Sequence, residues 1–231
     1  MRLRCSSAWA VSLPISCSTL SRFTSAPHLD AFLVLAYGQS EGSSSASGVM
    51  KPSVDRTLSC FVVPRWLPGG TRNAGFRIMR LKDKLGDRSN ASSEVEYDNA
   101  VGFLLGERGN GVPAILEMVV HTRLDCVLGS AALMRQAVRS AVNYCMKRRA
   151  FGTTLVDAPA MRAVLADLCV ESEAAVWMAM LLARAFEDGR MQHSDASQSI
   201  FRRLATAISK YWICKRTPLV VCEALECIGG K

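Results

Sequence analysis

The chain has 231 residues, of which 49% are apolar and 21% are charged, as in ordinary globular proteins. These proportions exclude collagen-like and low-complexity chains, and a chain of this length buries roughly 70% of the surface that its unfolded form exposes. Its 28 lysines and arginines outnumber its 20 acidic residues. The resulting charge of +8 suits an anionic small ligand and is too weak to require a nucleic-acid partner.

The cysteines and histidines indicate which cellular compartment the chain suits and whether it carries a metal site. The nine cysteines include no C-x-x-C pair, and the three histidines are scattered along the chain. This pattern favours neither a disulfide framework nor a metal site, and it fits a reducing compartment such as the cytoplasm or the mitochondrial matrix.

Residues 1–22 contain arginine and serine but no acid. This composition is typical of a mitochondrial transit peptide, and it fits an unstructured lead-in equally well. The most apolar internal run, residues 174–183, is too short to span a membrane.

Residues 23–110 have the pattern of a partial small β-domain. Apolar segments with strand character are separated by Gly, Pro, Asn and Ser clusters, and they cover residues 31–38, 58–66, 76–86 and 92–106. The Ser- and Gly-rich stretch 41–56 predicts an exposed loop inserted between the first two of these strands. Gly106, Gly109 and Gly111 lie in the wrong order for a dinucleotide-binding fingerprint and predict a tight strand-to-helix link.

Residues 112–231 predict an antiparallel helical bundle, so the fold class is α+β. One helix runs from Pro113 to Arg149 and a second from about 158 to 188. A third is capped by Ser194 or Asp195, and Pro218 opens a fourth that ends at Gly229.

Three segments in order, residues 80–112, 121–152 and 213–230, resemble the acyl-CoA dehydrogenases. Within that family they are most similar to the AidB-type flavoproteins of the adaptive response to alkylation damage. The most specific element is R-x-x-F-G after a long helix. The resemblance implies the middle and C-terminal domains of the family, truncated after the Gly-Gly turn, and a homo-oligomer, the family tetramer.

The resemblance also implies residues that bind the cofactor FAD. Arg148, Phe151 and Gly152 stand where the family contacts the pyrophosphate side of a flavin bound mainly by a neighbouring subunit. An arginine can pair bidentately with a phosphate there. The alternative is a solvated basic helix end, residues 147–149, favoured by the helix dipole.

Two further positions are implied in the same way. Thr24 and Ser25 match the hydroxyl residues that flank the flavin ring; the alternative is the frayed start of a strand. Gly229 and Gly230 resemble the Gly-Gly turn that lets the backbone approach the cofactor. The alternative is a simple helix C-cap.

The family's reaction removes a proton beside an acyl thioester while a hydride passes to the flavin. Its glutamate base is expected beyond Lys231, and Thr122 stands at the alternative base position, where a hydroxyl cannot replace a carboxylate. Arg123 is implied near the substrate pocket. We therefore expect an FAD-dependent, acyl-CoA dehydrogenase-like oxidoreductase acting on CH–CH groups of acyl thioesters, incomplete as a catalyst. The alternatives are a non-catalytic AidB-type flavoprotein or binding protein of the alkylation-damage response, and a non-functional gene fragment.

Overall fold

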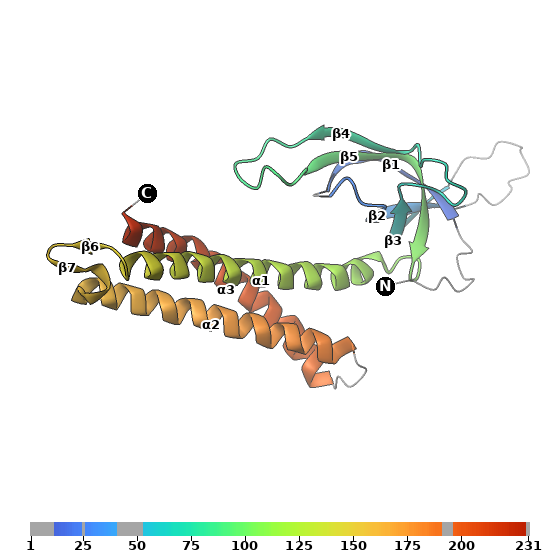
Figure 1. Ribbon diagram of the computed structural model, residues 1–231. Helices are drawn as coiled ribbons and strands as arrows, with labels where there is room; N and C mark the ends of the chain where they lie inside the picture. The colour runs from blue at the N-terminus through green and yellow to red at the C-terminus, as the bar shows by residue number, and fades with distance from the viewer. Residues whose placement is uncertain (1–11, 25, 41–52, 191–195, 230–231) are drawn as a thin grey trace, which may run out of the picture. The chain divides into compact units, whose positions relative to one another are not determined.

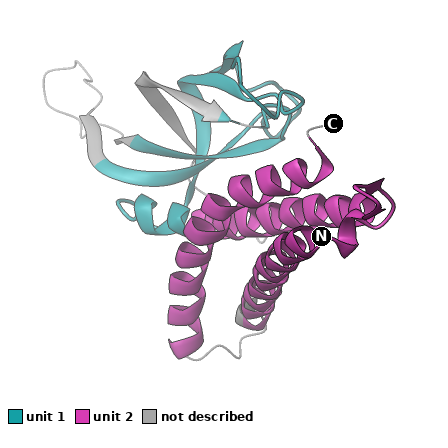
Figure 2. Ribbon diagram, turned by 90° about the vertical axis from the view of Figure 1, so that its left-hand side faces the viewer, with its two compact units in different colours: residues 1–117 teal, residues 118–231 magenta. Residues whose placement is uncertain are grey.

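The computed structural model describes residues 12–24, 26–40, 53–190 and 196–229 (Figure 1). The chain forms two compact units, Met1–Glu117 and Met118–Lys231 (Figure 2). The division lies within the first helix, a few residues beyond the expected boundary at 110–112.

The first unit contains an antiparallel sheet of five strands. These are β1 (Ser12–Thr24), β2 (Ala31–Ser40), β3 (Ser53–Pro64), β4 (Phe76–Leu81) and β5 (Ser93–Leu105). The strand order is β1-β5-β3-β2, and β4 also pairs with β5. β1 takes one edge of β5, whereas β4 and β3 pair with the first and last parts of its other edge.

Of the two interpretations of residues 1–22, the unstructured lead-in does not hold for residues 12–22, which form part of a strand, whereas the transit-peptide interpretation stays a prediction. Residues 12–22 lie in β1, which pairs with β5 from Ser12 opposite Phe103 to Thr24 opposite Ser93. The physical reason is the length of β5, because without β1 a whole edge of backbone N–H and C=O groups would lack strand partners. Residues 1–11 and 41–52 lie outside the described residues, and residues 53–56 of the expected loop belong to β3.

The sheet buries one face, as the alternation along β2 shows. Phe32, Val34 and Ala36 are buried, whereas Leu33 and Tyr37 are exposed, because successive side chains of a strand point to opposite faces. Phe32 stacks on Phe76 with ring centroids 4.7 Å apart. This core belongs to the first unit alone.

The glycine-rich segment between β5 and the first helix is the tight link that the sequence predicted. Gly109 has a φ of +78°, and its N–H donates to Ser59 Oγ at 2.9 Å. A Cβ on Gly111 would lie 2.5 Å from the Ser59 carbonyl carbon, so a larger residue could not occupy this position without displacing β3.

The second unit is built from three long helices. α1 spans Gly111–Cys145 and begins in the first unit, α2 spans Pro159–Arg190, and α3 spans Ala196–Ile228. A short hairpin, β6 (Arg149–Ala150) and β7 (Thr153–Thr154), and a 3-10 turn, η1 (Leu155–Asp157), connect α1 to α2. Successive helices run antiparallel (Figure 1).

The expectation of separate third and fourth helices is wrong, because α3 continues through Pro218. An internal proline removes one backbone hydrogen bond and costs about 3 kcal/mol. Both halves of α3 are nevertheless held by the core of the unit, which includes Ile213 before the proline and Val220 after it. Packing on both sides outweighs the local loss. The expected caps Ser194 and Asp195 lie outside the described residues.

The core of the second unit contains one stripe from each helix. Fully buried members include Val127 and Met134 of α1, Leu182 of α2 and Ala224 of α3. Among the described residues, no helix combines the length and apolarity needed to cross a membrane.

Candidate functional site

The end of the second unit that holds the β6–β7 hairpin brings together most of the expected cofactor residues. Cys145, the last residue of α1, places its Sγ 3.7 Å from the carbonyl oxygen of Cys227 near the end of α3. Arg148 follows three residues after Cys145, and Gly229 two residues after Cys227. The ends of α1 and α3 and the hairpin are called the hairpin end below (Figure 1).

Burial sets the chemistry of the two thiols in this contact. Burial raises the pKa of the Cys145 thiol. Burial also raises the pKa of the Cys227 thiol, and nearby Cys145 and Glu223 raise it further. Both groups are therefore poor nucleophiles at neutral pH, and they serve as packing between α1 and α3.

The backbone of Arg148 is fixed while its side chain is exposed. Its N–H donates to the Tyr144 carbonyl at 2.9 Å, and its own carbonyl accepts from the Leu155 N–H at 2.9 Å. Among the described residues, no carboxylate lies within ion-pair distance of its guanidinium. Lys147 and Arg149 are exposed beside it. Residues 147–149 thus present three cationic side chains, and the backbone of Arg148 is held by two hydrogen bonds.

Phe151 and Gly152 form the two-residue loop of the β6–β7 hairpin, between the paired Ala150 and Thr153. Their φ angles are +53° and +82°, as a type I′ turn requires at both central positions. A bulky residue is strained at positive φ, and asparagine is the usual choice there. Phe151 is also 100% exposed. An aromatic residue with a strained backbone, whose side chain has no packing role in its own unit, points to a role in binding.

Gly229 ends α3 with a φ of +81° and donates its N–H to the Glu226 carbonyl at 2.9 Å. A Cβ at this position would meet nothing within 4 Å. The C-cap alternative therefore accounts for the conformation of Gly229 by itself. Gly230 lies outside the described residues.

Thr24 belongs to the first unit, at the end of β1, where its Oγ1 accepts the Ala26 N–H at 3.2 Å. It is half-buried, and its hydroxyl hydrogen stays available to a ligand. Ser25 lies outside the described residues.

Thr122 and Arg123 are exposed on α1, far from the hairpin end. Thr122 Oγ1 donates to the Val119 carbonyl at 2.9 Å. At 1.5 Å per residue, Arg123 lies about 33 Å along the helix axis from Cys145. Arg123 and Arg148 of one chain therefore cannot hold the same phosphate group.

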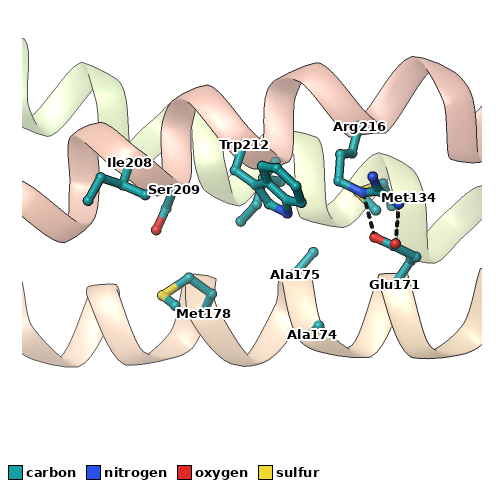
Figure 3. A pocket seen from close by; sticks show the side chains of 10 residues that line it. Met134, Glu171, Ala174, Ala175, Met178, Ile208, Ser209, Trp212 and Arg216 are labelled. Atoms are coloured by element: carbon teal, nitrogen blue, oxygen red, sulfur yellow. Dashed lines mark hydrogen bonds and ion pairs between the residues drawn. The ribbon is translucent and has the colours of Figure 1, made fainter.

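The sequence reasoning missed a groove between α2 and α3 (Figure 3). Its central feature is Arg216, which donates two hydrogen bonds to the carboxylate of Glu171, from Nε to Oε2 at 2.8 Å and from Nη2 to Oε1. These bonds raise the pKa of the Arg216 guanidinium. The guanidinium carbon lies 5.3 Å from the ring centroid of Trp212. The available signal was the pair of tryptophans, Trp177 and Trp212, outside the core stripes.

Comparison with known proteins decides the family. The model of the acyl-CoA dehydrogenase C-terminal domain matches residues 109–231, more than half of the chain. The chain belongs to the acyl-CoA dehydrogenase family. Enzymes of this family are FAD-dependent oxidoreductases, and the match covers α1, the β6–β7 hairpin, α2 and α3.

Two relatives are similar over most of this chain. The acyl-CoA dehydrogenase homologue AidB of Escherichia coli K12 is 44% identical over 208 residues, which are 90% of this chain and 35% of AidB. The crystal structure of Caenorhabditis elegans ACDH-11 in complex with C11-CoA has a TM-score of 0.74 and 28% identity, covering 87% of this chain and 33% of that one. The chain thus spans about a third of the length of these relatives.

Proposed function

We propose that this chain is the flavin-binding portion of an FAD-dependent, acyl-CoA dehydrogenase-like oxidoreductase that acts on CH–CH groups of acyl thioesters as a homo-oligomer. The observation that carries the proposal is the hairpin end. There the Arg148 guanidinium, which has no ion-pair partner among the described residues, stands three residues before Phe151, whose backbone is held at positive φ and whose ring is fully exposed. A ligand with phosphates next to an aromatic base matches this pair.

The donor chemistry of the hairpin end fits FAD. Arg148 can donate two parallel hydrogen bonds to a pyrophosphate oxygen pair, and Lys147 and Arg149 add positive charge nearby. Phe151 offers a ring face or edge to an adenine. Gly152, Gly229 and Gly230 have no side chain, so the backbone at these positions can approach the ligand closely. When bound, FAD supplies the hydride acceptor.

The distance along α1 supports a cofactor shared between subunits. The hairpin end of one chain would hold the pyrophosphate side of a neighbour's flavin. Thr24 and Ser25 would flank the ring of the chain's own flavin, and Arg123 would lie toward its own acyl pocket. Because Arg123 lies about 33 Å along α1 from Cys145, and Arg148 follows the end of that helix, the two arginines would serve different cofactor molecules. Thr122 supplies no carboxylate, so this position would provide no base.

A flavin titration tests the proposal. We expect the wild-type chain to quench FAD fluorescence, and Arg148→Ala to raise the dissociation constant about 10- to 100-fold, since a hydrogen bond between charged groups is lost. Arg139→Ala removes an exposed arginine of α1, away from the hairpin end, and should leave the titration unchanged. Absence of quenching by the wild-type chain, or equal binding by Arg148→Ala, would overturn the proposal.

A second candidate, a non-catalytic AidB-type flavoprotein or binding protein, is favoured by the 44% identity with AidB together with the hydroxyl at position 122. The two candidates differ in turnover. FAD-loaded protein that passes electrons from an acyl-CoA to an artificial dye acceptor would support the oxidoreductase. FAD-loaded protein that leaves the dye unreduced would support the non-catalytic flavoprotein. We also propose that the chain resides in the mitochondrial matrix or the cytoplasm.

A further inference from the structure

Two cysteines, Cys126 of α1 and Cys214 of α3, meet where these helices pack together in the second unit. Cys214 Sγ lies 3.7 Å from the carbonyl oxygen of Cys126, across 88 residues of sequence. A carbonyl oxygen is about 2.4 Å from the Cα of its own residue, so Cys214 Sγ is at most about 6 Å from the Cα that carries the Cys126 side chain. Rotation of the two side chains and a small approach of the helices would therefore bring the sulfurs into bonding distance.

A hydroxyl group holds the Cys214 sulfur at this place. Ser130 Oγ donates a hydrogen bond to Cys214 Sγ at 3.3 Å. Ser130 follows Cys126 by four residues, so the two are neighbours on one side of α1. The Cys214 sulfur is thus kept against the part of α1 from which the Cys126 side chain projects.

The two thiols combine this contact with access to solvent. Cys126 is exposed and Cys214 is half-buried. Exposed Arg123 precedes Cys126 by three residues on α1, and exposed Lys210 precedes its thiol, that of α3, by four. These spacings place a cation beside each thiol. Thiols in partly exposed, electropositive surroundings are the reactive ones in proteins.

Other cysteines suit such chemistry less well. Cys145 and Cys227 also meet between α1 and α3, but both are buried, so a disulfide reagent has no access to either sulfur in the folded unit. Cys222 is exposed on α3 but lies eight residues, about 12 Å along the helix, beyond Cys214. Among the described cysteines, contact and access coincide at Cys126 and Cys214.

We propose that Cys126 and Cys214 form a thiol–disulfide switch that fastens α3 to α1 under oxidising conditions. In a reducing compartment both thiols stay free, and a disulfide that forms there is a transient response to oxidation rather than a permanent part of the framework. The switch needs no flavin, so a failure of flavin binding would leave this proposal intact.

The step is thiol–disulfide exchange with glutathione disulfide as the oxidant. The Cys126 thiolate attacks one sulfur of glutathione disulfide, which forms a mixed disulfide and releases one glutathione thiolate. The Cys214 thiolate then attacks the Cys126 sulfur of the mixed disulfide, which forms the Cys126–Cys214 bond and releases the second glutathione. The protein loses two electrons and two thiol protons, and glutathione disulfide takes up both as it becomes two molecules of reduced glutathione.

Peptide mass spectrometry of the full chain tests the bond. After incubation with glutathione disulfide, the remaining thiols are blocked with N-ethylmaleimide and the chain is cut with trypsin. Cys126 and Cys214 are each the single cysteine of a tryptic peptide, residues 124–135 and 211–215. We expect these two peptides to be joined with the loss of two hydrogens, and dithiothreitol to separate them.

Three serine variants locate the bond. Cys126→Ser should abolish the joined peptide, and Cys214→Ser should stop the reaction at the mixed disulfide of Cys126 with glutathione. Cys222→Ser is the matched control, because it removes another exposed thiol of α3 and should keep the joined peptide. The oxidised Cys222→Ser chain should melt about 5–15 °C above its reduced form, since the bond closes a long loop of the chain.

Three outcomes would overturn the switch. A mixed disulfide that persists on Cys126 of the wild-type chain would mean that the Cys214 thiol does not reach it. Cys126 and Cys214 that both stay unmodified would mean that the pair does not react in the folded chain. A joined peptide without a rise in melting temperature would mean that the bond strains the contact between α1 and α3 instead of fastening it.

Discussion

Phe151 combines backbone strain with complete exposure, and this combination yields a prediction at the scale of one residue. Asparagine tolerates positive φ far better than phenylalanine, and Asn-Gly is the preferred type I′ turn. Phe151→Asn should therefore stabilise the second unit by about 1 kcal/mol, raising its melting temperature by about 3–6 °C. The same substitution should weaken FAD binding in the fluorescence titration, because the ring is lost.

Phe151→Ala separates the two effects. Alanine keeps most of the strain and removes the ring, so it should weaken FAD binding without raising the melting temperature. A melting temperature that does not rise in Phe151→Asn would show that the turn is not strained. Unchanged FAD binding in both variants would remove Phe151 from the proposed cofactor site.

At the same scale, the sequence identified the residues of the hairpin end but not their conformations. R-x-x-F-G pointed to Arg148, Phe151 and Gly152, and the structure brings them to the end that also holds Gly229. The positive φ of Phe151 was unpredictable, since local propensity disfavours it. Gly229 shows the reverse case, because its C-cap conformation follows from a glycine directly after a helix.

At the scale of elements, Pro218 inside α3 leads to a prediction about stability. The proline lacks an N–H for the carbonyl four residues earlier, and its ring crowds that carbonyl. Pro218→Ala should restore the hydrogen bond and raise the free energy of unfolding by about 1–3 kcal/mol. Urea denaturation followed by circular dichroism measures this change.

Lys215→Ala serves as the control on the same helix. Lys215 is exposed, so its replacement should change the free energy of unfolding by a few tenths of a kcal/mol at most. A loss of stability in Pro218→Ala would instead mean that the proline helps to place the end of α3 against Cys145. That outcome would also predict weaker flavin binding.

Elements were predictable where one physical signal dominated. The alternation in β2 and the apolar spacing of α2 placed these elements within a few residues of their observed ends. β1 could not be predicted, because its pairing depends on an edge of β5 about eighty residues away. Continuity of α3 could not be predicted either, since the core contacts on both sides of Pro218 are tertiary.

At the scale of the molecule, the sequence predicted the α+β class and the order of the two parts, because composition changes sharply near residue 111. It did not predict the groove between α2 and α3. A helix with one buried apolar side and a second, exposed apolar side has a weak periodicity of apolar residues in its sequence. The apolar spacing recognised in the sequence was that of the buried stripe alone.

The response of the whole chain to alkaline pH sets two effects against each other. The net charge of +8 falls to zero near pH 9.2, which reduces self-repulsion and by itself favours folding. Buried thiols act in the opposite direction. Burial raises the pKa of Cys60 in the first unit, and of Cys145 and Cys227 in the second, above the ordinary 9.0.

The thiols should lower stability as the pH rises above about 9. In that range the unfolded chain releases its thiol protons while the folded chain retains them, so the folded state binds more protons and the free energy of unfolding falls with pH. Thermal melts between pH 8 and pH 10.5, approximate limits that bracket this titration, should show a falling melting temperature.

Cys145→Ala with Cys227→Ala should flatten this slope, whatever its cost at neutral pH. Cys126→Ala with Cys222→Ala removes two exposed thiols and should keep the wild-type slope. Equal slopes in all three proteins would assign the alkaline loss to other groups, and the Cys145–Cys227 contact would then tie α1 to α3 by packing alone.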